Sequence, residues 1–396
     1  MPSRLAWPYA ALGCSSWLLV NSLYGCLSDL VERTPEGWQL AYSIQCTMAT
    51  SNAVALAVFW GRNKPVTATA QRTVLLRRAA ALVGCGAVLA VLVASLWDVT
   101  FGASWSVALL SLSFLAGFQC AASNYVYYPL AAGEGDAGQS TAALATGEAL
   151  SGVAATALAW SQSMGTPGTS LRFSVSIYFG LLVIVYGVSA LGLARIARAP
   201  PPASDRNGEL LLPVRDNGTR DSTSGRFGAY ARPLLAQAGL AVLGFGMLPS
   251  LWPLIASRFP SQHTVLLALS TVSFVADPLG RYAAGSRDIR RWRCCCAAPA
   301  VAAVCGIGLV GVAFVGSGTL AAAPCSGAIA AATMGLFTGL FGFANTRAYI
   351  DTTARAVEGA VSPYHAAAWC ATAVQSGSLV GTLLALSLAQ WLGFVG

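Results

Sequence analysis

The stretch Gly13-Cys14-Ser15-Ser16-Trp17-Leu18-Leu19-Val20-Asn21 indicates what kind of fold this chain adopts. It lies in an apolar run long enough to cross a bilayer, since a helix of about 20 residues spans roughly 30 Å of hydrocarbon. Within this run Trp17 and Asn21 lie one helical turn apart and share a face. Because a polar amide at membrane depth costs free energy unless it meets a partner, we expect this face to line a cavity or contact other helices.

Apolar runs of this length recur along the whole chain. Of its 396 residues 56% are hydrophobic and 10% are charged, whereas soluble domains are about one quarter charged. The first run has no basic segment before it and no small-residue cleavage site, so we interpret it as a span and not as a signal peptide. We predict an all-α integral membrane protein with eleven transmembrane helices at 8–29, 39–60, 78–97, 105–128, 139–162, 173–195, 233–256, 264–283, 294–316, 324–345 and 363–392.

The spans fall into two groups separated by a polar segment. We predict a six-helix bundle at 1–195, a disordered cytoplasmic linker at 196–232 and a five-helix bundle at 233–396. The end of the eighth span, Ala276-Asp277-Pro278-Leu279-Gly280-Arg281, resembles an acidic-then-basic loop motif of the major facilitator superfamily. This 6+5 arrangement predicts a transporter in which substrate binds near the bilayer midplane between the bundles.

Positive charge predicts the orientation in the membrane. With a cytoplasmic N-terminus, only Arg33, Arg172 and Arg258 of the 23 Lys and Arg residues lie on the outer side. Cytoplasmic loops carry an excess of Lys and Arg. We therefore predict a cytoplasmic N-terminus and an extracellular C-terminus.

Polar side chains at mid-membrane depth are the candidate functional residues. Tyr128 shares a helix face with Asn124, so an uncharged, hydrogen-bonding cavity lined by aromatic rings is expected. The alternative is that these amides only bond between helices, at about 1 kcal/mol or less each. The candidates are Asn21, Asn52, Asn124, Glu148 and Gln375.

Three charged residues are candidates for coupling or gating. Glu148 would be disfavoured in its charged form without a partner, so it could couple protons, bind substrate, or remain a protonated carboxyl bonded to a neighbouring helix. Asp277 precedes Arg281 by four residues, and this spacing predicts an ion pair that closes an inner gate.

Other classes of function have little support in the sequence. The arginines are dispersed and not gathered on one soluble face, which argues against a nucleic-acid partner. With two histidines no metal-ligand spacing is present, and there is no phosphate-binding loop or nucleophile triad, so neither an enzyme nor a cofactor is expected. Cys294-Cys295-Cys296 follow a basic run at the membrane boundary; they are either palmitoylation sites or packing thiols.

Several motifs in order resemble those of the eukaryotic riboflavin transporters, a solute carrier family with eleven spans. The resemblance covers most of the membrane region but not the linker. It rests on Gly13 to Asn21, Pro35-Glu36-Gly37-Trp38, Asn52 before Trp60, Cys120-Ala121-Ala122-Ser123-Asn124, Gly147-Glu148-Ala149-Leu150-Ser151, Asp277-Pro278-Leu279 and Gln375-Ser376-Gly377-Ser378-Leu379-Val380-Gly381.

The resemblance implies riboflavin uptake across the plasma membrane by alternating access, with Trp17, Asn21, Asn52, Asn124 and Gln375 as binding residues. Three positions depart from the family: Cys26 replaces a glutamate, Glu148 a glutamine and Asp277 an asparagine.

The chemistry of riboflavin suits the candidate cavity. Its isoalloxazine can stack on Trp17 or Tyr128, and amides can bond its uracil-like edge and ribityl hydroxyls. As a neutral solute it can enter by facilitated diffusion. The alternatives are a transporter of another neutral aromatic solute such as a nucleoside, and a membrane receptor that binds a ligand without moving it.

Overall fold

The protein is built almost entirely of helices. The computed structural model describes residues 6–59, 68–101, 105–162, 171–200, 222–286, 297–314, 325–358 and 362–392. Within these ranges the only strand-like pairing is an isolated bridge between Phe101 and Trp105. The predicted all-α fold is therefore confirmed.

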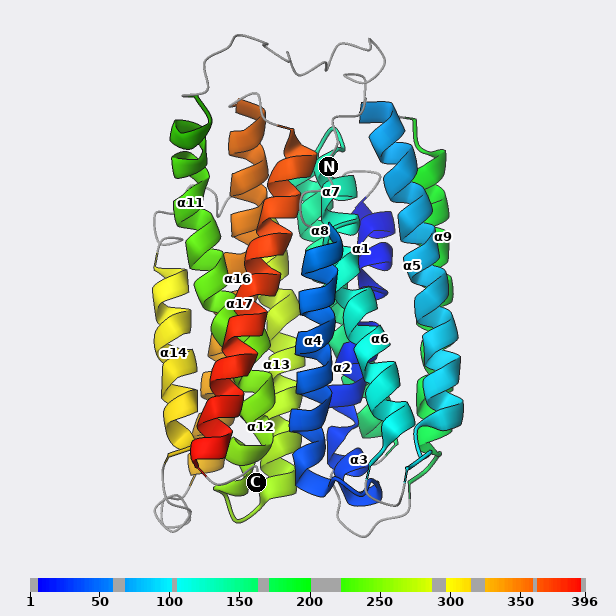
Figure 1. Cartoon of the computed structure of the whole chain (residues 1–396), viewed down its shortest axis with the longest axis vertical. Helices are drawn as coiled ribbons and strands as arrows, with labels where there is room; N and C mark the ends of the chain where they lie inside the picture. The colour runs from blue at the N-terminus through cyan, green and yellow to red at the C-terminus, as the bar shows by residue number, and fades with distance from the viewer. Residues whose placement is uncertain are drawn as a thin grey trace.

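The helices form two groups that lie side by side (Figure 1), with α8 packed along α13 and α4 along α17 where the groups meet. The first group comprises α1 (Ala6–Cys14), α2 (Leu18–Gly25), α3 (Leu27–Arg33), the 3₁₀ turn η1 (Gly37–Gln39), α4 (Leu40–Phe59), α5 (Ala68–Leu96), α6 (Val107–Asn124), α7 (Tyr127–Ala132), α8 (Ala137–Ser161) and α9 (Val175–Arg198). The second comprises α11 (Ser222–Ala241), the π-helical η2 (Val242–Met247), α12 (Leu248–Ser257), α13 (Gln262–Gly285), α14 (Ala298–Val312), α16 (Ser326–Glu358) and α17 (Pro363–Trp391).

Helix occupies each of the predicted spans, although their boundaries differ. Among the described residues, eight helices are long and apolar enough to cross a membrane. The segment α14 is shorter, the first span is broken, and α4 is not among the eight, so the total of eleven stays a prediction. The start of α1 and the end of α17 lie at opposite ends of the molecule (Figure 1), as an odd number of crossings requires.

The predicted linker is partly helical. Helix α9 continues to Arg198 and α11 begins at Ser222, so both ends of the range 196–232 belong to helices. The remainder of the range, 201–221, lies outside the described residues, and so do Cys294, Cys295 and Cys296.

The first span is broken twice, where one continuous helix was predicted. After α1, the amides of Ser15 and Ser16 bond back only three residues, to Leu12 and Gly13, as in a tight turn. The Ser15 hydroxyl also donates to the Leu12 carbonyl at 2.7 Å. Serine side chains compete in this way with the helical ladder. Such breaks are tolerated at membrane depth where they line a cavity.

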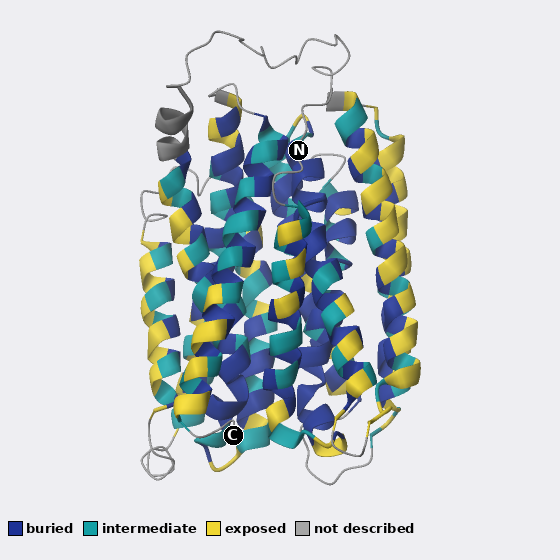
Figure 2. Cartoon of the chain, viewed as in Figure 1, coloured by how far each residue is buried: buried dark blue, intermediate teal, exposed yellow. Residues whose placement is uncertain are grey.

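Outward-facing helix surfaces are apolar. Figure 2 shows exposed residues concentrated on the outer faces of α5, α9 and α14, while the faces between helices are buried. Val88, Ile184 and Val304 are among these exposed side chains. Since water would not favour so much exposed apolar surface, the described helices form a multi-pass membrane protein.

Small residues set the distance between α1 and α8. A Cβ added at Gly147 would lie 1.9 Å from the Ala10 carbonyl oxygen, and one at Gly13 would lie 2.2 Å from the Leu144 carbonyl oxygen. In both cases the obstacle is backbone, which cannot rotate away. Close approach through small residues is how membrane helices gain packing energy in the absence of a hydrophobic drive.

We predict that Gly147→Ala lowers the melting temperature of the purified protein, because α1 and α8 must separate to admit the methyl group. Gly187→Ala is the matched control: it also removes a helical glycine, but nothing lies within 4 Å of its added Cβ. The control should be neutral or slightly stabilising, since alanine favours helix by about 1 kcal/mol over glycine. Equal melting temperatures for the two variants would contradict this account of the packing.

Candidate functional site

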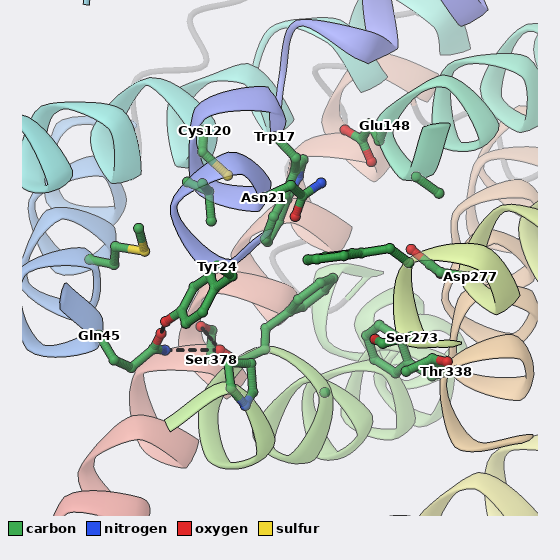
Figure 3. Close-up of a pocket in the computed structure, with 18 of the residues that line it drawn as sticks. Trp17, Asn21, Tyr24, Gln45, Cys120, Glu148, Ser273, Asp277, Thr338 and Ser378 are labelled. Carbon is green, nitrogen blue, oxygen red and sulfur yellow. Dashed lines mark hydrogen bonds between the residues drawn. The ribbon is translucent and has the colours of Figure 1, made fainter. Parts of the chain in front are cut away.

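A cavity of about 100 Å³ lies between the two helix groups. Its walls come from α2, α4, α6 and α8 on one side and from η2, α12, α13, α16 and α17 on the other. Residues far apart in the sequence therefore meet here (Figure 3). The predicted functional residues that line it are Trp17, Asn21, Asn52, Glu148, Asp277 and Arg281.

The break before α2 places Trp17 at the cavity. Its ring stacks on that of Phe245 in η2, with ring centroids 4.6 Å apart and planes inclined by 28°. The neighbouring Ser16 donates to a carboxylate oxygen of Glu148 in α8 at 3.1 Å. The break therefore delivers an aromatic face and a hydroxyl to the same region.

The amides in the cavity wall bond to other helices as well as lining the cavity. Asn21 Nδ2 donates to Ser151 Oγ of α8 at 2.8 Å, and Asn52 Nδ2 donates to Ser378 Oγ of α17 at 3.4 Å. The first bond stays within one half, and the second crosses between halves. A bond between helices and a place in the cavity wall are thus compatible for these side chains.

Gln45 makes two hydrogen bonds to the second half. Its Nε2 donates to the Phe245 carbonyl at 3.1 Å and to Thr382 Oγ1 at 3.0 Å, while Tyr24 donates to its Oε1. With three partners, the amide has little freedom to rotate, which keeps the wall beside Phe245 in one arrangement.

A buried cluster of three charges joins α8 to α13. Arg281 Nη1 lies 2.9 Å from Glu148 Oε2, and Arg281 Nε lies 2.9 Å from Asp277 Oδ1. The side chains of Arg281 and Glu148 are each 3% exposed, so the pair between the halves is withdrawn from solvent. Tyr128 also donates to Glu148 Oε2, at 2.7 Å. Buried charges are tolerated when paired and hydrogen-bonded in this way.

This cluster corrects two expectations. The cavity is not uncharged, because Glu148, Asp277 and Arg281 all line it. Glu148 is also not a lone carboxyl: its partner Arg281 comes from the other half of the chain, 133 residues later. The ion pair expected between Asp277 and Arg281 is present, but it is shared with Glu148 and lies at the cavity itself.

Asn124 and Tyr128 lie beside a second cavity of about 10 Å³, which is too small for an organic solute and adjoins the first at Trp17, Glu148 and Phe245. The Tyr128 ring stacks on that of Tyr349, with centroids 3.9 Å apart, and both side chains are fully buried. This stack joins α7 to α16. Tyr128 therefore packs between the halves and does not offer a free face to the larger cavity.

Gln375 is buried in α17 but is not among the residues that line either of these cavities. Its neighbours on the same helix are closer to them: Val374 lines the small cavity and Ser378 the large one.

Sequence reasoning missed several aromatic residues of the wall. Phe245, Trp252 and Phe341 line the cavity from the second half, and Tyr24 contacts Trp252 with ring centroids 5.8 Å apart. Aromatic residues inside apolar runs look like core or lipid-facing residues, so no local signal marks them. The glycines at 244 and 246 beside Phe245 are the one hint that η2 is irregular.

Among the described residues, no group of three or more His, Cys, Asp or Glu could hold a metal ion.

The N-terminal part of the chain matches the family model described as solute carrier family 52, riboflavin transporter, over residues 7–171. This region is similar to the riboflavin transporters of solute carrier family 52. A relative is the member 2 riboflavin transporter of solute carrier family 52 from Sus scrofa, which is 30% identical over 230 residues, or 53% of this chain and 48% of the relative. The corresponding Homo sapiens protein is 31% identical over 123 residues, covering 30% of this chain and 26% of its own.

The aligned regions thus span about half or less of the length of the curated relatives. Solved structures extend the similarity in fold to nearly the whole chain. The major facilitator superfamily transporter FucP, in its outward conformation, has a TM-score of 0.54 at 13% identity and covers 99% of this chain and 92% of its own. The nucleoside transporter NupG has a TM-score of 0.51 at 12% identity, covering 98% and 91%. The predicted major-facilitator-like fold is confirmed.

We predict that Arg281→Gln destabilises the protein by about 3–5 kcal/mol, because the buried carboxylate of Glu148 and the partly exposed one of Asp277 lose their cation. Glu148→Gln should cost less, since Arg281 keeps Asp277 as a partner. In the double variant the loss of unfolding free energy should be smaller than the sum of the losses in the two single variants. The reason is that each substitution removes the charge that the other substitution would leave unpaired. Unfolding of the purified proteins in detergent measures all three, and additive effects would contradict the proposed ion pair.

Proposed function

We propose that this protein transports riboflavin across the plasma membrane by alternating access, with helices 1–195 and 233–396 as the two moving bundles. The observation that carries the proposal is a cavity between the two halves in which an aromatic face, amides and hydroxyls converge, in a chain whose first 171 residues include the riboflavin transporter match. The relatives are named as riboflavin transporters, which supports the same substrate here.

The polar and apolar parts of the cavity suit different parts of riboflavin. Trp17 and Phe245 offer aromatic surface to the flat isoalloxazine. Asn21 and Asn52 offer amide groups, which can donate to and accept from the uracil-like edge and the ribityl hydroxyls. We assign these residues to substrate binding, while Asn124, Tyr128 and Gln375 support the wall from behind.

The size of the cavity supports a mechanism with movement. Pockets for drug-sized ligands hold roughly 300–1,000 Å³, and this cavity has about 100 Å³. Riboflavin needs more space than this, and we infer that the cavity widens when the halves move apart. The cluster of Arg281, Glu148 and Asp277 joins them on one wall, so we assign it to gating.

Facilitated diffusion down a riboflavin gradient is sufficient to account for net uptake of a neutral solute, and the protein is proposed as a transporter and not as an enzyme. The similarity to NupG is one of fold alone and does not favour a nucleoside as substrate. Uptake of labelled riboflavin by cells that express the protein, with lumiflavin and nucleosides as competitors, separates this function from nucleoside transport and from a receptor that moves nothing.

Asn21→Ala should weaken riboflavin binding by roughly 5-fold to 150-fold, because truncation leaves substrate polar groups unpaired at a cost of about 1–3 kcal/mol. The variant also removes the bond from Asn21 Nδ2 to Ser151 Oγ. Ser151→Ala removes the same bond but keeps the amide, and it is the matched control. Riboflavin-induced thermal stabilisation should be lost in Asn21→Ala and kept in Ser151→Ala. Equal loss in both variants would assign Asn21 to helix packing.

The orientation in the membrane gives a further test. The proposed topology leaves most Lys and Arg residues in the cytoplasm. In this topology a tag at Gly396 should be accessible in intact cells, whereas a tag within 203–225 should require permeabilisation. If both tags require permeabilisation, the proposed topology is wrong.

A further inference from the structure

Within the described ranges, two stacked aromatic pairs join the halves, and they differ in their surroundings. Tyr128 and Tyr349 are fully buried, with a centroid distance of 3.9 Å. Trp17 and Phe245 are only partly buried, lie 4.6 Å apart, and both line the large cavity. The first stack is packing, while the second lines the cavity where a solute would bind.

Phe245 is held in place by its backbone and by one neighbouring ring. Its carbonyl accepts from Gln45 Nε2 at 3.1 Å and from Ser378 Oγ at 3.3 Å. Phe341 packs against it edge-on, with centroids 4.8 Å apart and planes at 84°. The π-helical geometry of η2 carries this segment, as π turns often do at functional sites.

Glycines let η2 approach its neighbours closely. A Cβ at Gly246 would lie 2.5 Å from the Gly381 Cα of α17, and one at Gly244 would lie 2.7 Å from the Phe341 ring. The backbone on both sides of Phe245 therefore packs tightly against α16 and α17 of the second half.

We propose that Phe245 determines substrate specificity by forming, with Trp17, a clamp for a flat fused-ring solute. The proposal rests on the proposed function and names the residue that recognises the ring system. A ring between two others needs two contact distances of about 3.5 Å each, or roughly 7 Å. Since Trp17 and Phe245 are 4.6 Å apart, insertion of the ring separates the halves that carry them.

This geometry selects for ring size. A fused tricyclic system overlaps both aromatic faces, whereas a single pyrimidine ring covers less of each, and stacking free energy grows with overlap. The amides Asn21 and Asn52 can bond either kind of solute, so they do not distinguish them. Selection of a flavin over a single-ring solute therefore depends on the clamp.

Binding of riboflavin to purified protein, followed by the fluorescence of the flavin, tests the proposal. Phe245→Leu keeps an apolar side chain but loses the aromatic face. The affinity for riboflavin should therefore fall roughly 5-fold to 100-fold, which is the range seen when a nucleobase loses an aromatic stacking partner. Phe245→Tyr should stay within about 3-fold of the parent, and Phe245→Met repeats the loss with another apolar side chain. An indole ring quenches the fluorescence of a flavin stacked on it, so riboflavin bound against Trp17 should be quenched in the parent. Phe245 holds the flavin against Trp17 in this proposal, so the bound flavin should be less quenched in the Leu and Met variants.

Tyr349→Leu is the matched control, because it removes the other aromatic stack between the halves. It should lower the melting temperature while leaving riboflavin affinity and quenching near those of the parent. If the parent binds riboflavin and Phe245→Leu binds it equally well with the same quenching, the clamp is overturned and the proposed function stands. If the parent neither binds nor takes up riboflavin, the proposed function fails and the clamp fails with it.

Discussion

The arrangement of the two halves depends on one buried cation. Arg281 lies between Glu148 of α8 and Asp277 of its own helix, and its side chain is 3% exposed. In a medium of low dielectric constant an unpaired charge costs several kcal/mol, so neither half can move away from this contact without providing another partner or water. The cluster thus fixes where α8 meets α13, and the cavity wall is built around it. With two carboxylates and one guanidinium, the ionised cluster carries a net negative charge.

Irregular helices surround this contact on both sides of the interface. The first span stops at Cys14 and resumes at Leu18, and the seventh passes through the π-helical η2. Each irregularity brings an aromatic ring to the cavity, Trp17 from one half and Phe245 from the other. Discontinuous helices near the midplane are a recurring way for transporters to build a binding site. The two halves therefore contribute matching features to the cavity although their sequences differ.

The sequence predicts the spans well and their interruptions poorly. Apolar runs locate helices because lipid requires every backbone group to be bonded within the helix, and this requirement is visible in composition. Composition gives no sign of the break at Ser15 to Trp17, because these residues fit an apolar run. The polar residues of the first half were found because Asn21, Asn52 and Glu148 stand out in such runs. The partner of Glu148 could not be found, because Arg281 is distant in sequence and meets it only through packing of α8 on α13. Phe245 was missed because an aromatic residue in an apolar run gives no sign of facing a cavity. Gln375 stands out in the sequence because it is polar, but it lines neither of the two cavities.

The proposed transport path runs between the two helix groups, with riboflavin bound where the aromatic rings and amides meet. An experimentally determined structure of the purified protein with riboflavin bound is the most direct test. The account predicts isoalloxazine density between Trp17 and Phe245, with these rings farther apart than 4.6 Å and with Asn21 in hydrogen-bonding range of the ligand. Riboflavin bound on the lipid-facing surface, with Trp17 still stacked on Phe245, would contradict it.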